Sequence, residues 1–418
     1  MARPARRVLL SLGVALGLVA AGSGAAIVGC GSTGGARKSA GGGAGSPEDS
    51  GPCPAEAPAP GVLPGVRPEE RTAGYWIGRS PDPDAVVLSA ADIERHEEAF
   101  AAAHEASPDD DPLTHEDLRQ PPAKALVEHE LTERLTYLRE RVKDGRYVAA
   151  NGEKLSGDEL RVFESPGATP PLLDELRRVE QDTTLWCGPR AEGLFKGPEP
   201  DLAFDRNVCS TVRKDEVLRV VATWPGGMRL VRTPYAFGWL AEDARLSAPL
   251  SRQDADAALE PRRRDLTRRA LLEEAFRYLD SPYGWGGKDG GRDCSRFVMD
   301  VFSSFGLRLP RHSGGQAKAG SMVIDVTPVT SAREREALLD AAQDRGIVLL
   351  HFPGHVMLYL GRNEAGRPMV MHAFAEYLEA CDPERAAEAG RTETLRRVDR
   401  VQVSDMTLGE GTSRTSFL

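Results

Sequence analysis

The sequence lacks the patterns that mark most metal centres and nucleotide-binding loops. Its six cysteines form no Cys-x-x-Cys pair, so we expect no zinc or iron–sulfur site. The glycine-rich segment over residues 286–291 has neither the G-x-x-x-x-G-K-[ST] nor the G-x-G-x-x-G spacing of phosphate-binding loops. No basic tract interrupts an overall charge of -10, and nucleic acid is not an expected partner. We therefore expect neither a metal nor a cofactor.

The N-terminus predicts export. Arginines at positions 3, 6 and 7 precede an apolar run over residues 8–28, which is typical of a secretory signal over residues 1–29 and not of a folded domain. The sequence Ile-Val-Gly that precedes Cys30 resembles the bacterial lipobox, which implies that Cys30 is acylated and becomes the first mature residue. We expect an exported protein anchored to a lipid bilayer through Cys30, on the periplasmic face of the outer membrane.

The rest of the chain predicts several domains, because 418 residues exceed one ordinary core. Residues 30–71 are rich in Gly, Ser, Ala and Pro and are expected to be a disordered tether, in which Cys53 has no evident partner. Residues 72–175 are expected to be mainly helical. A Ser89–Asp92 capping box and an apolar face over residues 131–142 indicate two of the helices.

Residues 176–250 change to a β pattern. Residues 217–224 and 228–232 predict two strands joined by a tight Pro-Gly-Gly turn. Residues 234–240 then resemble the terminal Gly-Trp strand of bacterial SH3-like barrels, which implies a small SH3-like β-barrel. Its tryptophans are either a binding platform or core residues. Cys187 and Cys209 share this segment, and in an exported protein they are the best candidates for a disulfide.

Cys294 is a candidate nucleophile. Asp293 predicts an N-cap, Cys294 begins a helix, and Gly306 ends it after an apolar stripe. A thiol at the positive end of a helix dipole favours the thiolate, which is the form that attacks a carbonyl group.

Two downstream histidines are candidates for its base. His355 and His372 fall in successive predicted strands, and a hairpin register that places residue 360 near 368 or 369 makes them cross-strand neighbours on one face. A slip by one residue would separate them onto opposite faces. His351 is a second candidate base, because its even offset from His355 favours the same face of a strand.

Three ordered motifs, YGWGG…DCSRF…FGLRLPR, PGHVMLYLG and MHAF, resemble those of the NlpC-type cell-wall peptidases, which are papain-like cysteine enzymes. The resemblance implies an α+β protein whose papain-like catalytic domain spans residues 262–418, after the barrel and the helical region. It implies that Cys294 is the nucleophile, that His355 is the general base and later acid, and that His372 orients His355.

The same resemblance assigns residues around the substrate. It implies that Tyr283 and the Cys294 backbone N–H stabilise the oxyanion. Asp293 and Ser295 would shape the site and hold the free amino end of the substrate, with Trp285 beside them. Arg296 stands where the family usually has glycine, and it is expected to narrow the cleft or contact an acidic peptide.

These assignments predict a monomeric peptidoglycan hydrolase. The resemblance implies a cysteine endopeptidase that cleaves the γ-D-glutamyl–diamino-acid bond, with meso-diaminopimelate as the diamino acid, in cell-wall stem peptides. Two alternatives remain at this stage: a wall-binding lipoprotein without turnover, and an acyltransferase or amidase on the same fold.

Overall fold

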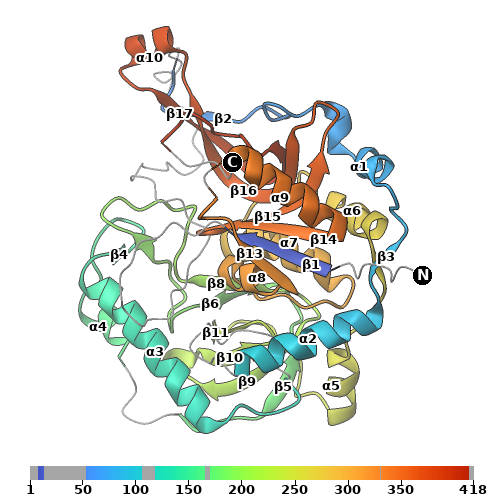
Figure 1. The fold of residues 1–418 in the computed structure, drawn as a ribbon. Helices are drawn as coiled ribbons and strands as arrows, with labels where there is room; N and C mark the ends of the chain where they lie inside the picture. The colour runs from blue at the N-terminus through green and yellow to red at the C-terminus, as the bar shows by residue number, and fades with distance from the viewer. Residues whose placement is uncertain (1–7, 14–52, 106–117, 165–169, 330, 414–418) are drawn as a thin grey trace.

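The computed structural model describes residues 8–13, 53–105, 118–164, 170–329 and 331–413, and every structural statement concerns these residues. Two β-sheets organise the fold, and helix α7 (Cys294–Ser303) lies between them (Figure 1). The protein is of the α+β class, as predicted. Among its described helices, none combines the length and the apolar character that crossing a membrane requires.

The larger sheet has seven strands in the order β13-β1-β14-β15-β16-β17-β2. Its strands are β13 (Met322–Asp325), β1 (Val8–Gly13), β14 (Gly346–Phe352), β15 (His355–Arg362), β16 (Pro368–Ala380), β17 (Glu393–Asp405) and β2 (Glu56–Pro58). Strands β14 to β17 form an antiparallel meander, whereas β1 is parallel to both of its neighbours and β2 is parallel to β17. The two successive strands predicted to carry His355 and His372 are therefore β15 and β16.

Helices cover both faces of this sheet, which explains why its central strands are almost continuously apolar. Along β14, Leu349 belongs to the core that includes α7, while Val348 and Leu350 belong to a second core. The second core is closed by α9 (Ala332–Arg345), which lies over the sheet on the opposite side from α7 (Figure 1). The amphipathic helix that begins at Cys294 is thus held between two layers.

The smaller sheet has six antiparallel strands in the order β5-β9-β10-β11-β6-β8. These are β5 (Glu175–Arg178), β9 (Val217–Thr223), β10 (Arg229–Thr233), β11 (Ala236–Leu240), β6 (Thr183–Trp186) and β8 (Val208–Val212). The predicted β9–β10 turn forms because Gly226 and Gly227 both adopt φ of 82°, a region that favours glycine. Trp224 and Trp239 pack edge to face inside the hydrophobic core. Of the two roles expected for these tryptophans, both therefore have that of core residues and not that of a binding platform.

The predicted helical region over residues 72–175 divides between the two cores. Helix α3 (Lys124–Lys143) buries Leu131 and Leu135 against the six-stranded sheet. By contrast, Trp76 and Ile93, from α1 (Ala73–Arg79) and α2 (Ala90–Glu105), belong to the core around α7. The sequence pattern identifies the helices but not the sheet that each of them covers.

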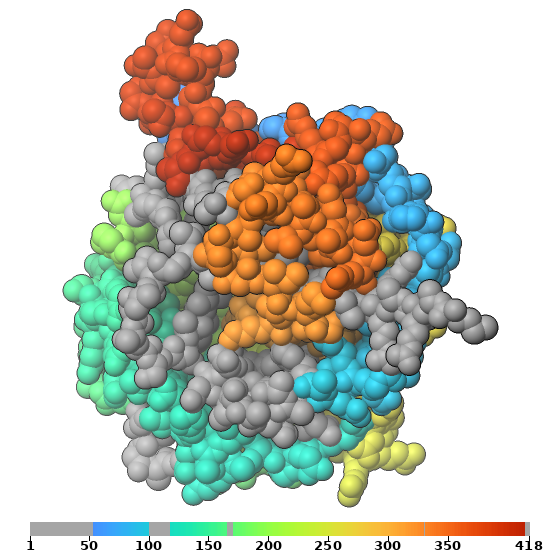
Figure 2. Space-filling model, viewed as in Figure 1, coloured from blue at the N-terminus to red at the C-terminus, as the bar shows by residue number. Residues whose placement is uncertain are grey.

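The remaining elements connect these layers. They are η2 (Pro68–Arg71), β3 (Val86–Leu88), β4 (Tyr147–Val148), α4 (Gly157–Arg161), β7 (Phe195–Lys196), η3 (Pro225–Gly227), α5 (Arg252–Leu259), β12 (Leu266–Thr267), α6 (Arg268–Phe276), η4 (Trp285–Gly290), α8 (Ser313–Lys318) and α10 (Pro383–Ala389). Strands β16 and β17 extend as a long hairpin, and α10 at its tip projects from the body of the molecule (Figure 2).

The expectation of a disordered tether is wrong for residues 53–71. Cys53 forms a disulfide with Cys381, β2 pairs with β17, and Leu63 is buried against the hairpin. Low-complexity composition cannot reveal this order, because it comes from a covalent link across 328 residues of sequence and from a long-range strand pairing.

The predicted signal segment also differs in part. Residues 8–13 form β1, paired with β13 and β14, although an export leader is expected to lie outside the fold. A run of aliphatic residues fits a parallel strand as well as it fits a leader, so the pattern alone does not separate the two. Cys30, the predicted lipidation site, lies outside the described residues.

Candidate active site

Cys294 occupies the first position of α7, where the backbone gives it a fixed setting. The Asp293 side chain caps the helix by accepting a 2.7 Å hydrogen bond from the Arg296 backbone N–H. The Cys294 side chain is buried, and its Sγ lies 3.9 Å from the carbonyl oxygen of Gly354, the residue that precedes β15. The sulfur therefore lies both at the positive end of a helix and at the start of the strand that carries His355.

Cys294 is disulfide-bonded in the structure. Nucleophilic chemistry requires the thiolate, so this sulfur can react with a substrate only after reduction.

Two histidines and a serine form a hydrogen-bonded chain beside this helix. His355 Nε2 lies 2.7 Å from His372 Nδ1, and His372 Nε2 lies 2.9 Å from Ser404 Oγ. His372 also stacks on Phe374, with ring centroids 4.0 Å apart. The structure thus brings together the two histidines that the strand pattern placed on one face.

The register between their strands differs slightly from the expected one. Leu358 pairs with Met371 and Gly361 with Met369, so Leu360 is an extra residue in a bulge. Extending the pairing of Leu358 by three residues places His355 opposite position 374. His372 is therefore a diagonal neighbour on the same face, and the imidazole rings span the offset.

The chain of contacts fixes which ring nitrogen can act as a base. For His355 Nδ1 to accept a proton, its Nε2 must carry hydrogen and donate to His372 Nδ1. His372 then carries hydrogen on Nε2 and donates it to Ser404 Oγ. Ser404 was missed at the sequence level, although β17 alternates core valines with the polar residues Gln402 and Ser404, and that alternation points the polar pair at one face.

Burial keeps these imidazoles neutral. It lowers the pKa of His355 to about 3, helped by the neighbouring His351, while the charge of Asp293 acts in the opposite direction. Burial also lowers the pKa of His372 well below its ordinary value, and His355 adds to this effect. A neutral imidazole is the form that can take a proton from a thiol. A Cys294 thiolate would raise the pKa of His355, because an adjacent anion favours the imidazolium.

His351, the second candidate base, lies on β14 rather than on the strand of His355. It pairs with Val356 across the β14–β15 hairpin, and burial lowers its pKa to about 4. Within the described part of the chain, His372 hydrogen-bonds with His355 and Ser404 and not with His351. The arrangement therefore favours His355 as the base.

The glycine-rich segment before Cys294 is a close-packed loop, η4. Gly286 has φ of 64°, and a Cβ on it would meet Val208 Cγ1 of β8 at 2.4 Å, so this position requires glycine. Its backbone N–H donates to Asp293 Oδ2 at 3.0 Å, which ties the loop to the cap of α7. Trp285 is buried here, with its ring 5.4 Å from that of Phe204 in an edge-to-face contact.

Tyr283 begins the same loop. Its backbone N–H donates to the Asp399 carbonyl at 2.8 Å. Burial, followed by the charge of Asp293, raises the pKa of Tyr283 well above its ordinary value. Its hydroxyl therefore stays protonated, as a hydrogen-bond donor to an oxyanion must be.

Asp293 makes internal contacts through both carboxylate oxygens. Arg311 donates to them at 3.1 and 2.6 Å, and Ser295 Oγ donates to Oδ1 at 3.1 Å. Burial alone would raise the pKa of Asp293, but Arg311 outweighs it and holds the pKa below its ordinary value. The contacts fill the positions that a substrate amine would need. Asp293 and Ser295 therefore organise the loop and helix, and their contact with a substrate amine stays a prediction.

The expectation that Arg296 faces the cleft is wrong. Its side chain is 4% exposed and points into the six-stranded sheet, where it donates to Glu216 at 2.9 Å and to the Thr211 carbonyl at 3.0 Å. It also binds Asp300 of its own helix at 2.7 Å. The arginine at position 296, where the family usually has glycine, is visible in the sequence, but the direction of its side chain is not. That direction depends on the packing of α7 between two sheets.

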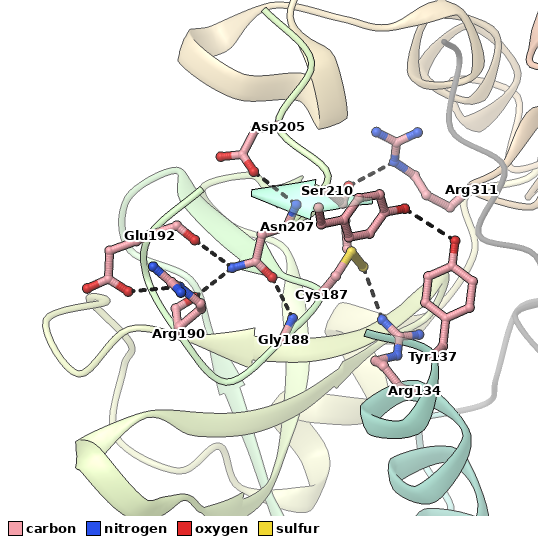
Figure 3. The surroundings of a disulfide bond; sticks show 12 residues. Arg134, Tyr137, Cys187, Gly188, Arg190, Glu192, Asp205, Asn207, Ser210 and Arg311 are labelled. Atoms are coloured by element: carbon pink, nitrogen blue, oxygen red, sulfur yellow. Dashed lines mark hydrogen bonds and ion pairs between the residues drawn. A yellow bond between two sulfur atoms is a disulfide. The ribbon is translucent and has the colours of Figure 1, made fainter. Parts of the chain in front are cut away.

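The predicted cysteine pair of the six-stranded sheet is bonded, with Cys187 and Cys209 sulfurs 2.04 Å apart. Figure 3 shows this bond below Ser210 and close to Arg311, whose Nε donates to Ser210 Oγ at 2.8 Å. Arg134 of α3 donates to Cys209 Sγ at 3.1 Å. The disulfide thus stabilises the part of the sheet on which the glycine-rich loop η4 and Arg311 rest.

Comparison with known proteins identifies a family domain over this site. Residues 280–380 match the model of the NlpC/P60 family, and this range contains Cys294, His355 and His372. The gamma-D-glutamyl-L-lysine dipeptidyl-peptidase of Bacillus subtilis (strain 168) is 37% identical over 92 residues, which are 22% of this chain and 28% of that protein. A probable endopeptidase of Mycobacterium tuberculosis (strain CDC 1551 / Oshkosh) is 40% identical over 57 residues, 13% of this chain and 15% of that protein.

A solved structure extends the similarity in fold. The NlpC/P60 endopeptidase from Photobacterium damselae subsp. piscicida superposes with a TM-score of 0.52 over 81% of this chain and 91% of its own, at 15% identity. The chain spans about a quarter of the length of the first curated relatives, at 28% and 25%. Residues 280–380 thus resemble the NlpC/P60 family, and the likeness in fold extends beyond them.

Proposed function

We propose that this protein is a peptidoglycan hydrolase, a cysteine endopeptidase that cleaves the γ-D-glutamyl–meso-diaminopimelate bond of stem peptides. The observation that carries the proposal is the hydrogen-bonded chain from His355 through His372 to Ser404, beside a cysteine at a helix N-terminus. The NlpC/P60 domain and relatives named as a dipeptidyl-peptidase and an endopeptidase support the same class.

The reduced Cys294 begins the reaction. Its thiol gives a proton to His355 Nδ1, and the thiolate attacks the γ-carbonyl carbon, forming a C–S bond. The carbonyl oxygen becomes an oxyanion that accepts hydrogen bonds from the Cys294 backbone N–H and the Tyr283 hydroxyl. His355 then protonates the leaving nitrogen of the diamino acid, and the C–N bond breaks.

Water completes the cycle. It enters after the amine leaves, gives a proton to His355, and attacks the thioester that links the acyl group to Cys294. Collapse of this second intermediate breaks the C–S bond, returns the proton to sulfur, and releases the D-glutamyl carboxylate. Throughout, the bond from His355 to His372 keeps the imidazole oriented.

Purified protein under reducing conditions, incubated with L-Ala-γ-D-Glu-meso-diaminopimelate, tests the proposal by mass spectrometry of the products. We expect the wild type to release L-Ala-D-Glu and free diaminopimelate, and Cys294→Ala to release neither. Ser303→Ala, an exposed position at the other end of α7, is the matched control and should keep full activity. Full activity in Cys294→Ala would overturn the proposal.

A wall-binding lipoprotein without turnover is a second candidate, and the complete burial of the Cys294 side chain is the observation that favours it. It predicts sedimentation of the protein with sacculi and no released dipeptide, with or without reductant. Release of dipeptide only when a reductant is present would favour the peptidase. An acyltransferase or amidase on the same fold would give a different product mass in the same assay.

We also propose export, a lipid anchor at Cys30 and an SH3-like fold for the six-stranded sheet. The apolar leader and lipobox-like sequence support the first two, and the antiparallel β9, β10 and β11 with the Gly238–Trp239 strand support the third. Incorporation of labelled palmitate into the wild type, and its loss in Cys30→Ala, tests the anchor. Equal labelling of both proteins would contradict it.

A further inference from the structure

We propose that Arg206 and Trp285 form a subsite that binds a carboxylate of the peptide substrate. The inference rests on the proposed function, because it assigns the bound peptide to the cleft of the same active site. It names a specificity residue outside the NlpC/P60 domain, on the unit formed by the six-stranded sheet.

The position of Arg206 links this sheet to the catalytic loop. Arg206 precedes β8 by two residues, and Val208, the first residue of that strand, packs against Gly286 of the loop. The guanidinium carbon of Arg206 lies 4.4 Å from the centroid of the Trp285 ring. Phe204 packs edge to face against the same indole ring. This contact fixes the position of the ring that Arg206 covers.

The guanidinium of Arg206 has no anionic partner. Across the described residues, no hydrogen bond or ion pair joins it to another side chain, and its Nε is buried without a hydrogen bond. Arg296 and Arg311, which also cross between the two sheets, each bind a carboxylate, at 2.9 and 2.6 Å. Arg206 is therefore an exception among the arginines of this interface.

A partly buried cation without a partner is costly, because it has lost water and gained no anion. Burial lowers the pKa of Arg206. Three tyrosines, at positions 147, 283 and 137, act against this effect, and Asp201 makes a smaller contribution in the same direction. The residue as a whole remains partly exposed. A carboxylate bound there would offset the lost hydration.

The chemistry of the site selects the ligand. A planar guanidinium donates two parallel hydrogen bonds to a carboxylate, and an indole ring beneath it supports the adjoining backbone or aliphatic carbons of a peptide. Trp285, which Arg206 covers, follows Tyr283, the proposed oxyanion donor, by two residues. The carboxylate is therefore assigned to a residue next to the cleaved bond, in an anionic peptide.

Steady-state kinetics under reducing conditions tests the subsite. The substrates are L-Ala-γ-D-Glu-meso-diaminopimelate and two analogues, each amidated at one carboxylate, either the α-carboxylate of D-Glu or that of diaminopimelate. For Arg206→Gln we expect KM for the parent peptide to rise about 10- to 100-fold, the range for loss of a charged hydrogen bond, with kcat almost unchanged. One amidated peptide should be cleaved equally by both proteins, and it identifies the carboxylate.

Two further variants separate recognition from packing. Arg206→Lys keeps the charge and should restore part of the affinity for the parent peptide. Arg245→Gln removes the same charge from an exposed position after β11 and should behave as the wild type. An equal loss on all three peptides in Arg206→Gln, or no loss at all, would overturn the subsite.

Calorimetric titration of Cys294→Ala, with and without Arg206→Gln, makes the test independent of turnover. The parent peptide should bind more weakly to the double variant, and one amidated peptide should bind both proteins equally. If the wild type cleaves no peptide, the proposed function fails while this pair of titrations still decides the subsite. Equal binding of the parent peptide by both proteins would refute the subsite alone.

Discussion

Arg311 binds Asp293, the residue that caps the catalytic helix, through two hydrogen bonds of 3.1 and 2.6 Å. The same guanidinium donates to Ser210 of the six-stranded sheet at 2.8 Å (Figure 3). Both charged residues are almost fully buried. The cap that positions Cys294 is thus tied to a sheet from another part of the chain, and its stability depends on a single cation.

Removing that cation should destabilise the fold. Arg311→Met leaves the Asp293 carboxylate buried without its partner, and breaking a buried pair in this way typically costs about 3–5 kcal/mol. Urea denaturation followed by circular dichroism measures the loss. Arg333→Met, at an exposed position of α9, should change the free energy of unfolding by less than about 0.5 kcal/mol. Similar stabilities for the two variants would contradict the role given to Arg311.

Replacing the histidines one at a time distinguishes the two candidate bases. His355→Ala should lower kcat/KM by about 10²- to 10⁴-fold, the usual contribution of a general base. His351→Ala should retain most of the activity, because His355 and not His351 bonds to His372. Hydrolysis of the parent tripeptide under reducing conditions measures both. A larger loss in His351→Ala would reverse the assignment.

Ser404 should act on catalysis through His372. Ser404→Ala removes the partner of the buried His372 Nε2, and an unsatisfied buried donor costs about 1–3 kcal/mol. If part of this cost appears as a wrong tautomer, kcat should fall and the pH profile of kcat/KM should shift. Ser404→Thr keeps the hydroxyl and should restore the wild-type profile. A lower stability with an unchanged kcat and pH profile would show a purely structural role.

Stability should fall with pH below neutrality. The folded protein holds the pKa of His355 at about 3, below the value of about 6.5 in an unfolded chain. Between these values the unfolded chain binds the extra proton, so the free energy of unfolding decreases as pH falls and is constant for this group above about 6.5.

Removing the imidazole tests this dependence. For His355→Gln, the decrease in the free energy of unfolding from pH 7 to pH 5 should be smaller than in the wild type, by up to about 2 kcal/mol. Urea titrations at the two pH values under the same redox conditions give the comparison. An identical pH dependence for both proteins would show that His355 titrates normally in the folded state.

Local signals in the sequence were sufficient for the helix that starts at Cys294 and for the β9–β10 hairpin. The Asp293 cap and the apolar stripe define the helix, and the glycines at positive φ define the turn. The proximity of His355 and His372 could also be predicted, because side chains alternate between the two faces of a strand and the expected pairing of the two strands places both histidines on the same face. The bulge at Leu360 was not, since it depends on how β15 meets β16.

The long-range contacts could not be predicted. Arg311 reaches Ser210 across 101 residues, and Cys53 bonds to Cys381 across 328 residues. Neither partner carries a local pattern, because a single polar or thiol contact leaves no periodicity. The direction of Arg296 was missed for the same reason, since it depends on which sheet covers each side of α7.

Arg296 also limits how this protein can be rearranged by recombination. Its guanidinium, two residues from Cys294, binds Glu216 and the Thr211 carbonyl of the six-stranded sheet. A gene fragment that encodes only residues 262–418 would produce a chain whose catalytic helix carries an arginine without these partners. Helix α7 therefore depends on contacts from both parts of the chain, and residues 262–418 would not fold in the same way without the six-stranded sheet. Replacing that sheet with the sheet of a relative would succeed only if the new sheet supplied an acceptor for Arg296.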